Sequence, residues 1–243
     1  MRMVEGLRTR KKERTRRAIS EVAIAMFLEH GFDQVGVAEI AAAAEVSKPT
    51  LFRYFPSKED LVLDRISDHR GEAAAVVRAR PAGRTPLDAL HDAFMAGLDA
   101  REPTTGLCDH PAVMAYHRLV FDTPSLASRV AEYAAADTEA LAEAMSEPMS
   151  EPVSEMSETG GMGGMGGAVG PAPGAPASTP GPVPRLTSRL VAAQYVAVRQ
   201  ILARDNYAAL ASGRTAGEVH GEAVAAAGTA FDLLRHGARA HGL

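Results

Sequence analysis

Residues 39–61, EIAAAAEVSKPTLFRYFPSKEDL, constrain the fold of this chain more than any other stretch. Apolar residues recur at helical spacing in its first half. Ser47 then supplies an N-cap oxygen, and Pro49 stands in the first turn of a new helix, where its missing N–H costs nothing. Leu51 and Phe55 are four residues apart, so they share the face that packs against the first helix. The pattern predicts two short helices joined by a tight turn, with a polar face left open.

The polar side chains on that open face have the chemistry of DNA recognition. Arg53 can donate two parallel hydrogen bonds to guanine O6 and N7, a pair worth about 1–3 kcal/mol of discrimination. Lys58 opens the next helix behind a Ser57 cap, where its ammonium and the free backbone N–H groups suit one phosphate. The alternatives are ordinary solvated charges and, for Tyr54, a core position. The predicted DNA contacts are Lys48, Pro49, Thr50, Arg53, Tyr54 and Lys58, with Arg16 and Arg17 from upstream.

The order of these residues resembles the helix-turn-helix of the TetR/AcrR family of regulators. Residues 50–55, TLFRYF, and residues 57–61, SKEDL, follow the family's Thr-Leu-Tyr/Phe-x-Tyr-Phe and Ser-Lys-Glu-x-Leu pattern. The resemblance covers about the first sixty residues strongly and the rest only in architecture.

Three positions depart from the family pattern. Phe52 stands where many relatives have tyrosine. Glu45 occupies a turn position where glycine is usual, so it has to take a positive φ or alter the turn. Gly36 stands where a serine or threonine cap is common, so we expect the following helix to be less well anchored.

A basic run precedes the motif. Residues 8–17 contain seven Lys and Arg side chains and lead into an amphipathic helix that is expected to end at Gly31. Such a run is often a solvated tail. Joined to a helix-turn-helix, it is more consistent with an arm that follows the phosphate backbone or enters the adjacent minor groove. Residues 1–60 hold eleven basic and nine acidic side chains, whereas the whole chain has a net charge of −4, so only the N-terminal part suits a polyanion.

Length and composition set the remaining bounds. The 243 residues accommodate a DNA-binding domain over residues 1–60 and a helical regulatory and dimerisation domain over residues 61–243. Residues 146–185 are rich in Ser, Glu, Pro, Gly and Met, which predicts a disordered low-complexity insert of unknown role. No convincing period-two strand is found, so the fold class is all-α.

Two further observations bear on the environment of the protein. The single cysteine, Cys108, excludes an internal disulfide and fits a reducing compartment. No apolar run approaches the roughly eighteen residues of a membrane helix, and the basic N-terminus leads into a charged helix. We therefore expect a soluble, cytoplasmic protein without a membrane partner.

The helical pattern continues downstream of the motif. Expected helices lie at about residues 57–77, from Thr85 with Pro86 in the first turn, at 110–121, at 125–145, from Thr187, and from Thr215, where residues 215–218 form a capping box.

The resemblance also implies a ligand cavity and a two-fold partner. In TetR-like proteins the last two helices pair with those of a second copy, and the middle helices enclose a small molecule. Both residue sets serve equally well as ordinary core. The candidate dimer interface is Gln194, Val198, Ile201, Ala223, Ala227 and Phe231. The candidate ligand pocket is Phe94, Met95, Leu98, Met114, His117, Phe121 and Tyr133.

Catalytic and metal chemistry find little support in the sequence. There is no nucleophile with a base, no paired carboxylates and no phosphate loop, so no enzyme and no cofactor are predicted. His110 and His117 are seven residues apart, about 10.5 Å along a helix, which is too far for one ion without other ligands. No metal site is predicted.

These observations together predict a sequence-specific DNA-binding transcriptional regulator. The most specific version is a homodimeric repressor that binds a palindromic operator in double-stranded DNA and is released by a small-molecule ligand. The alternatives are a ligand-independent architectural DNA-binding protein and a small-molecule-binding protein with a weakened DNA reader.

Overall fold

The computed structural model describes the backbone of residues 2–147 and 185–238, and the side chains of residues 10–147 and 185–237. Within these ranges the regular elements are all helices and no strand occurs, which confirms the all-α fold class. The low-complexity insert predicted at residues 146–185 lies almost wholly outside the described residues.

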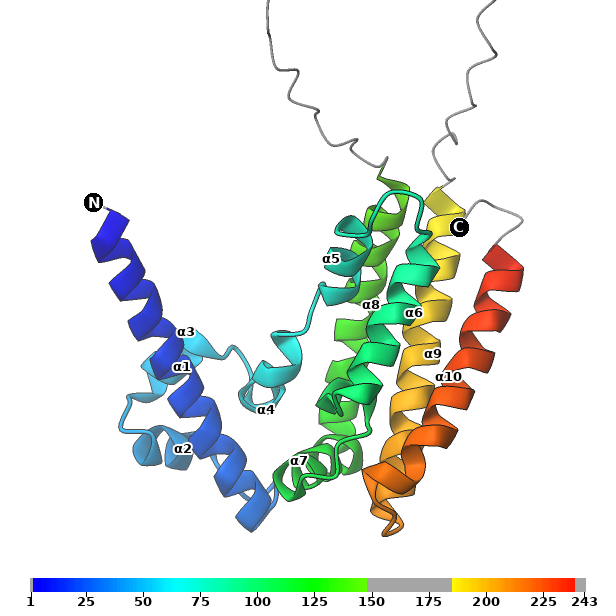
Figure 1. The fold of residues 1–243 in the computed structure, drawn as a ribbon. Helices are drawn as coiled ribbons and strands as arrows, with labels where there is room; N and C mark the ends of the chain where they lie inside the picture. Colours follow the sequence, from blue (N-terminus) through cyan, green and yellow to red (C-terminus); the bar gives the residue numbers. More distant parts are fainter. Residues whose placement is uncertain (1, 148–184, 239–243) are drawn as a thin grey trace, which may run out of the picture.

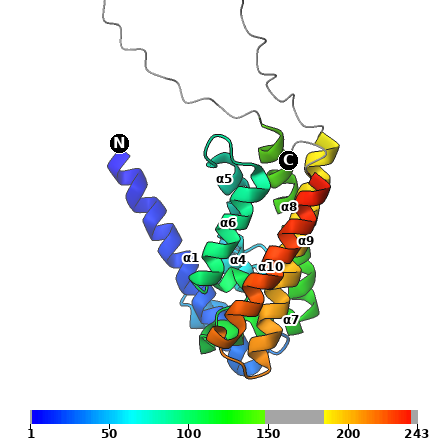
Figure 2. The same cartoon turned by 45° about the vertical axis from the view of Figure 1, so that its right-hand side comes forward.

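The helices form two groups (Figure 1). The N-terminal group is α1 to α4, and a bundle of α5 to α10 stands beside it; in Figure 2 α1 lies to one side of the bundle. The elements are α1 (Arg2–His30), α2 (Val37–Ala43), α3 (Lys48–Tyr54), α4 (Lys58–Ser67), α5 (Glu72–Arg78), α6 (Pro86–Asp99), η1 (Pro103–Thr105), α7 (Pro111–Asp122), α8 (Pro124–Ser146), α9 (Arg185–Ala211) and α10 (Ala216–Ala238).

The helix starts that the sequence marked are capped as expected. The Ser47 hydroxyl accepts a hydrogen bond from the Thr50 N–H at 3.2 Å, and Thr85 caps α6 in the same way. At the start of α10, the Thr215 N–H donates to the Glu218 carboxylate at 2.7 Å, and the Glu218 N–H donates back to the Thr215 hydroxyl at 3.3 Å. The predicted capping box is confirmed, since local side-chain chemistry satisfies the free N–H groups of each first turn.

The single helix predicted over residues 57–77 is wrong. The chain forms α4, which ends at Ser67, and α5, which begins at Glu72. Gly71 between them has a φ of +76°, a left-handed conformation that glycine takes without steric cost, and its N–H donates to the Asp137 carboxylate of α8 at 3.2 Å. A break set by a contact 66 residues away gives no periodicity signal.

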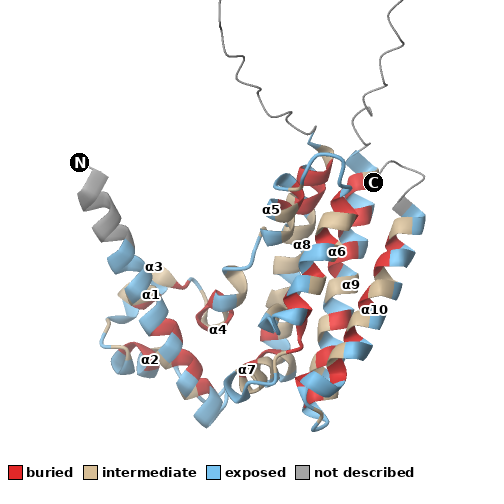
Figure 3. Cartoon of the chain, viewed as in Figure 1, coloured by how far each residue is buried: buried red, intermediate tan, exposed pale blue. Residues whose placement is uncertain are grey.

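The N-terminal core continues past the expected boundary at residue 60. It is built on α1 to α4, with Leu61, Val62 and Leu63 fully buried, and Tyr116, Val120 and Leu126 from α7 and α8 complete it. Figure 3 shows buried segments in both helix groups, and those of α4 lie between them. The two groups therefore share buried contacts through α4, α7 and α8.

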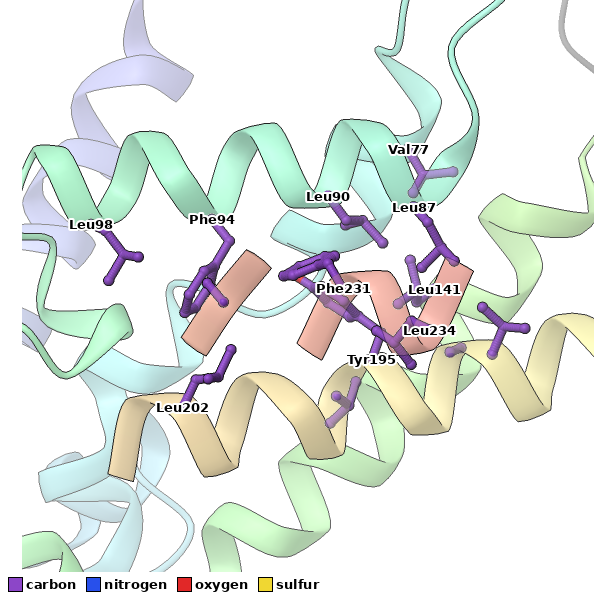
Figure 4. Packing of buried hydrophobic residues seen from close by; sticks show 14 of the residues in the cluster. Val77, Leu87, Leu90, Phe94, Leu98, Leu141, Tyr195, Leu202, Phe231 and Leu234 are labelled. Carbon is purple, nitrogen blue, oxygen red and sulfur yellow. The ribbon is translucent and has the colours of Figure 1, made fainter. Parts of the chain in front are cut away.

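The C-terminal core fills the space between α6, α8, α9 and α10 (Figure 4). Phe231 of α10 lies at its centre, with ring centroids 6.1 Å from Phe94 and 6.0 Å from Tyr195. Gly106, with a φ of +73°, allows the chain after η1 to approach α9 closely, because a Cβ there would lie 1.9 Å from the carbonyl oxygen of Ala203. Long helices packed along an apolar seam make this group.

No helix in the described part of the chain is long and apolar enough to cross a membrane.

Candidate nucleic-acid interface

The turn between α2 and α3 has the geometry that the sequence requires. Glu45 takes a φ of +54°, as expected for a side chain in a position that favours glycine. The Val46 N–H closes the turn on the Ala41 carbonyl at 2.9 Å. At the other end of α2, the Gly36 N–H donates to the Glu39 carboxylate at 2.6 Å. The expected weak anchoring of α2 is therefore corrected: Glu39 provides the bond that the missing cap side chain does not.

α3 presents one buried face and one polar face. Leu51 and Phe55 are fully buried, whereas Lys48, Pro49 and Arg53 are exposed. The Arg53 guanidinium stands over the ring of the half-buried Tyr54, 5.6 Å from its centroid. The Thr50 hydroxyl lies 2.8 Å from that of Ser47, within the cap. The outward side chains of α3 are those expected of a base-reading helix, with Thr50 already hydrogen-bonded.

Lys58 is half-buried, and its ammonium has partners within the chain, so the predicted phosphate contact stays a prediction. Its ammonium donates to the carbonyl of Phe32 at 2.5 Å and lies 4.5 Å from the centroid of the Phe32 ring and 5.5 Å from that of Phe27. Cation–π contacts and a carbonyl bond hold the charge at the α1–α2 junction. Lys58 therefore fixes this junction, while the N-terminus of α4 keeps its Ser57 cap.

Arg16 also has a structural partner. Its Nε donates to the Asp64 carboxylate of α4 at 2.6 Å, and its guanidinium lies 5.4 Å from the centroid of the Phe55 ring. The hydrogen bond to Asp64 raises the pKa of Arg16 above its usual value. Arg16 thus ties α1 to α4 although 43% of its side chain is exposed, and Arg17 is exposed. A DNA contact by either residue stays a prediction.

The sequence analysis missed Asp60, whose side chain joins the two helix groups. One carboxylate oxygen accepts from the Ser57 N–H at 3.1 Å, and the other accepts from the Tyr133 hydroxyl at 2.9 Å and from Arg129 at 3.3 Å. Burial alone would raise the pKa of Asp60, but the hydrogen bonds from Ser57 and Tyr133 and the charge of Arg129 lower it overall. The Ser57–Asp60 spacing of a capping box was the available signal, but the partners in α8 had none.

Two further hydrogen bonds hold α4. The Tyr116 hydroxyl of α7 donates to the Val62 carbonyl at 2.9 Å, and burial raises the pKa of that hydroxyl. The Ser20 hydroxyl of α1 donates to the Leu61 carbonyl at 2.8 Å. α4, the helix that directly follows α3, is therefore hydrogen-bonded to α1, α7 and α8. These bonds hold α3 in place relative to the bundle.

This arrangement of α1 to α4 agrees with a family model. The model "Bacterial regulatory proteins, tetR family" matches residues 19–64, which run from the first buried residue of α1 into α4. Residues 19–64 are therefore similar to the N-terminal domain of TetR-family regulators. The matched stretch contains the helix-turn-helix formed by α2 and α3.

Curated relatives extend the similarity beyond the TetR domain. The chain is 40% identical over 135 residues to the HTH-type transcriptional regulator TcmR of Streptomyces glaucescens, covering 55% of this chain and 58% of TcmR. It is 36% identical over 87 residues to the putative mycofactocin biosynthesis transcriptional regulator MftR of Mycobacterium tuberculosis, covering 36% of this chain and 44% of MftR. The matches thus span about half the length of these relatives.

Comparison with solved structures aligns most of the chain at low sequence identity. Native NalD, the secondary repressor of the MexAB-OprM multidrug efflux pump in Pseudomonas aeruginosa, has 18% identity and a TM-score of 0.49, covering 90% of this chain and 96% of NalD.

The residues expected to line a ligand pocket are divided between the two cores. Phe94 and Leu98 are buried in the C-terminal core, with Met95 and Met114 packed against it. Phe121 and Tyr133 pack against the N-terminal core, and the Tyr133 hydroxyl is bonded to Asp60. The structure therefore places these residues against two different cores, and a ligand pocket lined by them stays a prediction.

His117 of α7, also predicted to line the ligand pocket, has a buried ring nitrogen without a hydrogen-bond partner among the described residues. That nitrogen is Nδ1, and burial lowers the pKa of the imidazole. The ring makes an edge contact with Tyr207 of α9, with centroids 5.5 Å apart, and lies 5.7 Å from the Phe121 ring. Buried polar atoms are nearly always hydrogen-bonded, so this nitrogen is an open position for a donor or an acceptor.

Two open hollows on the described surface are lined by other residues. One lies between the start of α4 and α8, beside Asp60 and Arg129; the other lies where α8 ends and α9 begins, beside Glu143 and Arg185.

The expected dimer residues also separate into two sets. Ala223, Ala227 and Phe231 are buried in the core of the chain itself, with at most 3% of their surface exposed. Gln194 and Ile201 are exposed and Val198 is half-buried. The small residues of α10 lie in this core, where α6 and α9 pack against that helix.

Within the described ranges, His, Cys, Asp and Glu side chains do not gather in groups of three or more that could hold a metal ion.

Proposed function

We propose that this protein is a sequence-specific transcriptional repressor that acts as a homodimer on a palindromic operator and is released by a small molecule. The observation that carries the proposal is α3, whose outward Lys48, Pro49 and Arg53 stand on a helix rigidly held by a capped turn and a buried inner face. The TetR domain match and the regulator relatives support the same function.

A single α3 of seven residues offers few base contacts. Two copies related by a two-fold axis double that number and read successive major grooves, with half-sites about 34–36 Å apart. A palindromic operator follows from this symmetry. Arg53 is the residue that we assign to base reading, with Lys48, Pro49, Thr50 and Tyr54 beside it.

A second copy of this chain is the occupant that we assign to the outer face of α9 and α10. These helices lie side by side on the flank of the bundle away from α1 to α4 (Figure 1). They expose large apolar side chains, with 54% of Leu190, 59% of Ile201 and 73% of Leu233 accessible. Such side chains on two neighbouring helices are typical of an association surface. Two identical faces of this kind form a four-helix contact.

Release by a small molecule is assigned to the region of His117. The unpartnered Nδ1, the edge of Tyr207 and the ring of Phe121 offer a polar atom beside aromatic surface. Sites of this composition suit a small, mostly apolar ligand with one hydrogen-bonding group. α7 also carries Tyr116, whose hydroxyl holds α4, so occupancy of the site can alter the support of the reader.

The test is selection of binding sites from a random duplex pool with the full chain at about 0.15 M salt, where non-specific attraction is reduced. We expect a palindrome whose half-sites are about ten base pairs apart or a multiple of that. Recovery of no motif contradicts the proposal and favours architectural binding.

The dimer is tested separately by Ile201→Glu, with Leu28→Glu as the matched control, since Leu28 is another exposed apolar side chain but lies on α1. We expect Ile201→Glu to sediment as a monomer and to lose operator affinity, because a buried unpaired carboxylate is costly. Sedimentation of both variants as dimers contradicts the assigned face.

A further inference from the structure

One large apolar side chain stands on the outer face of α3. Phe52 is 40% exposed, and among the described residues it is the single aromatic side chain in the set of large exposed apolar ones. It lies on the same face as Lys48, Pro49 and Arg53, which are also exposed. The outer face of this helix is therefore not wholly polar.

The four exposed side chains form two adjacent rows on α3. Lys48 and Phe52 are one helical turn apart, and so are Pro49 and Arg53. Pro49 and Phe52 are three residues apart, which makes them neighbours on the helix surface. The Lys48 ammonium lies 6.0 Å from the centroid of the Phe52 ring. An apolar centre thus lies between one cation towards each end of the helix.

Phe52 has no hydrogen-bonding atom in its side chain. A tyrosine, which the TetR pattern favours at this position, could offer a hydroxyl to a phosphate, whereas phenylalanine offers apolar surface alone. Removing that surface from water is favourable where the partner is apolar too, because a polar partner would lose its own bonds to water. The partner of Phe52 is therefore expected to be an apolar group.

The major groove of DNA presents one apolar group to such a ring. Guanine, adenine and cytosine show hydrogen-bond donors and acceptors at their edges, and thymine alone adds a C5 methyl group. A single exposed ring elsewhere on a protein surface needs no explanation. Phe52 differs because Arg53, the residue assigned to base reading, is its neighbour in the chain and lies on the same outer face.

We infer that Phe52 contacts the C5 methyl group of a thymine in each half-site, and so determines specificity at a base that Arg53 does not read. The inference rests on the proposed function, because α3 has to enter the major groove. Pro49 extends the same apolar contact, while Lys48 and Arg53 bind guanine or phosphate on either side of it. The half-site then combines a hydrogen-bonded base with a methyl-bearing one.

The test removes the methyl group from the DNA. The operator recovered by site selection is synthesised with uracil in place of each thymine in turn, since the two bases pair alike and differ only in the C5 methyl. Binding of the unmodified full chain to each duplex is compared with that of Phe52→Ala and Phe52→Tyr. Arg53→Ala is the matched control on the same face.

We expect one thymine in each half-site at which uracil weakens binding by about four-fold, as loss of one buried methyl group does, and about 15-fold when both half-sites are changed. Phe52→Ala should bind the thymine and uracil operators equally. Phe52→Tyr retains the ring and should keep the preference. Arg53→Ala should bind both operators more weakly in the same ratio.

A second base checks that the methyl group itself is recognised. Cytosine and 5-methylcytosine are placed in turn at the uracil-sensitive position, and the methylated duplex should bind the unmodified protein about four-fold more tightly. Phe52→Ala should show no such preference. Circular dichroism checks that this variant remains helical.

Equal affinity of the unmodified protein for the thymine and uracil operators overturns the inference and leaves the proposed function intact. An undiminished preference in Phe52→Ala also overturns it and assigns the methyl contact to another residue. An equal loss on both operators from Phe52→Ala gives the ring a role that does not read sequence, which contradicts the inference as well. Recovery of no motif removes the proposed function and the inference together.

Discussion

The N-terminal group and the helical bundle reach order by different means. α2 and α3 have seven residues each, so capping residues and the tight turn between them fix their ends. α9 and α10 have 27 and 23 residues and are fixed along an apolar seam that includes Phe231. Short helices are marginal alone and depend on their ends, whereas long ones depend on a packed face. The reader is thus specified locally and the bundle globally.

The largest expected effects come from core substitutions that test whether the two helix groups unfold separately. Phe55→Ala should cost about 3–5 kcal/mol, as large-to-small changes in a core do, and Phe231→Ala should cost a similar amount. Tyr116, Val120 and Leu126 place α7 and α8 in the N-terminal core, so we expect one cooperative unfolding transition for both variants. Chemical denaturation followed by circular dichroism measures this.

The matched control for Phe55 is Phe52→Ala, in the same helix but 40% exposed, which should change the free energy of unfolding by less than about 0.5 kcal/mol. Two separate transitions, with only one shifted by Phe55→Ala, would show that the groups are independent.

Replacing Asp60 tests the hydrogen bonds that connect α4 of the N-terminal group to α8 of the bundle. Asp60→Ala removes the acceptor for Ser57, Tyr133 and Arg129 and should cost about 1.5–3 kcal/mol of stability, since hydrogen bonds to a charged group are lost. Glu132→Gln, which removes the charge of another carboxylate paired with Arg129, should cost less than about 1 kcal/mol because that ion pair is exposed. If Asp60→Ala lowers the free energy of unfolding no more than Glu132→Gln does, Asp60 does not stabilise the contact between the two helix groups.

The pH dependence of the free energy of unfolding tests Asp60 a second time. The folded state lowers the pKa of Asp60, so its contribution to stability is present above the ordinary aspartate pKa of about 3.9 and is lost as the pH falls through the lower folded value. Between about pH 5 and pH 2 the unmodified protein should therefore lose more stability than Asp60→Asn. Parallel curves in acid titrations of the two proteins would contradict this.

Replacing Arg53 tests whether α3 reads bases. Arg53→Ala should weaken binding to the selected operator by about 1–3 kcal/mol and relax one base position. Arg118→Ala, an exposed arginine on α7, should leave operator affinity unchanged. Titration of the operator and of a random duplex separates the effects, and equal losses on both from Arg53→Ala would refute a base-reading role.

Glu45 gives the smallest expected effect. Its φ of +54° is strained for a side chain, so Glu45→Gly should raise the free energy of unfolding by about 0.5–1 kcal/mol. Glu45→Ala keeps the strain and should give no gain. Thermal denaturation of the two variants compares them, and a gain in both would assign the effect to the lost charge instead of the backbone.

The sequence by itself determined the features that depend on neighbours in the chain. Ser47, Thr215 and Pro86 marked helix starts, and Glu45 marked a strained turn, because a cap or a positive φ is settled within a few residues. The spacing of Leu51 and Phe55 also predicted the inner face of α3, since one helical turn joins them. The TetR domain was recognisable from that stretch alone.

The tertiary structure decided which partner each of these residues has. Lys58 and Arg16 are cations that the sequence could assign to DNA, and in the fold they also contact carbonyl, aromatic and carboxylate groups far along the chain. Phe231 and Ala227 suit a dimer face or a core equally well, and only the approach of α6 and α9 makes them core. Periodicity states which face of a helix is apolar; contacts between distant segments decide what that face meets.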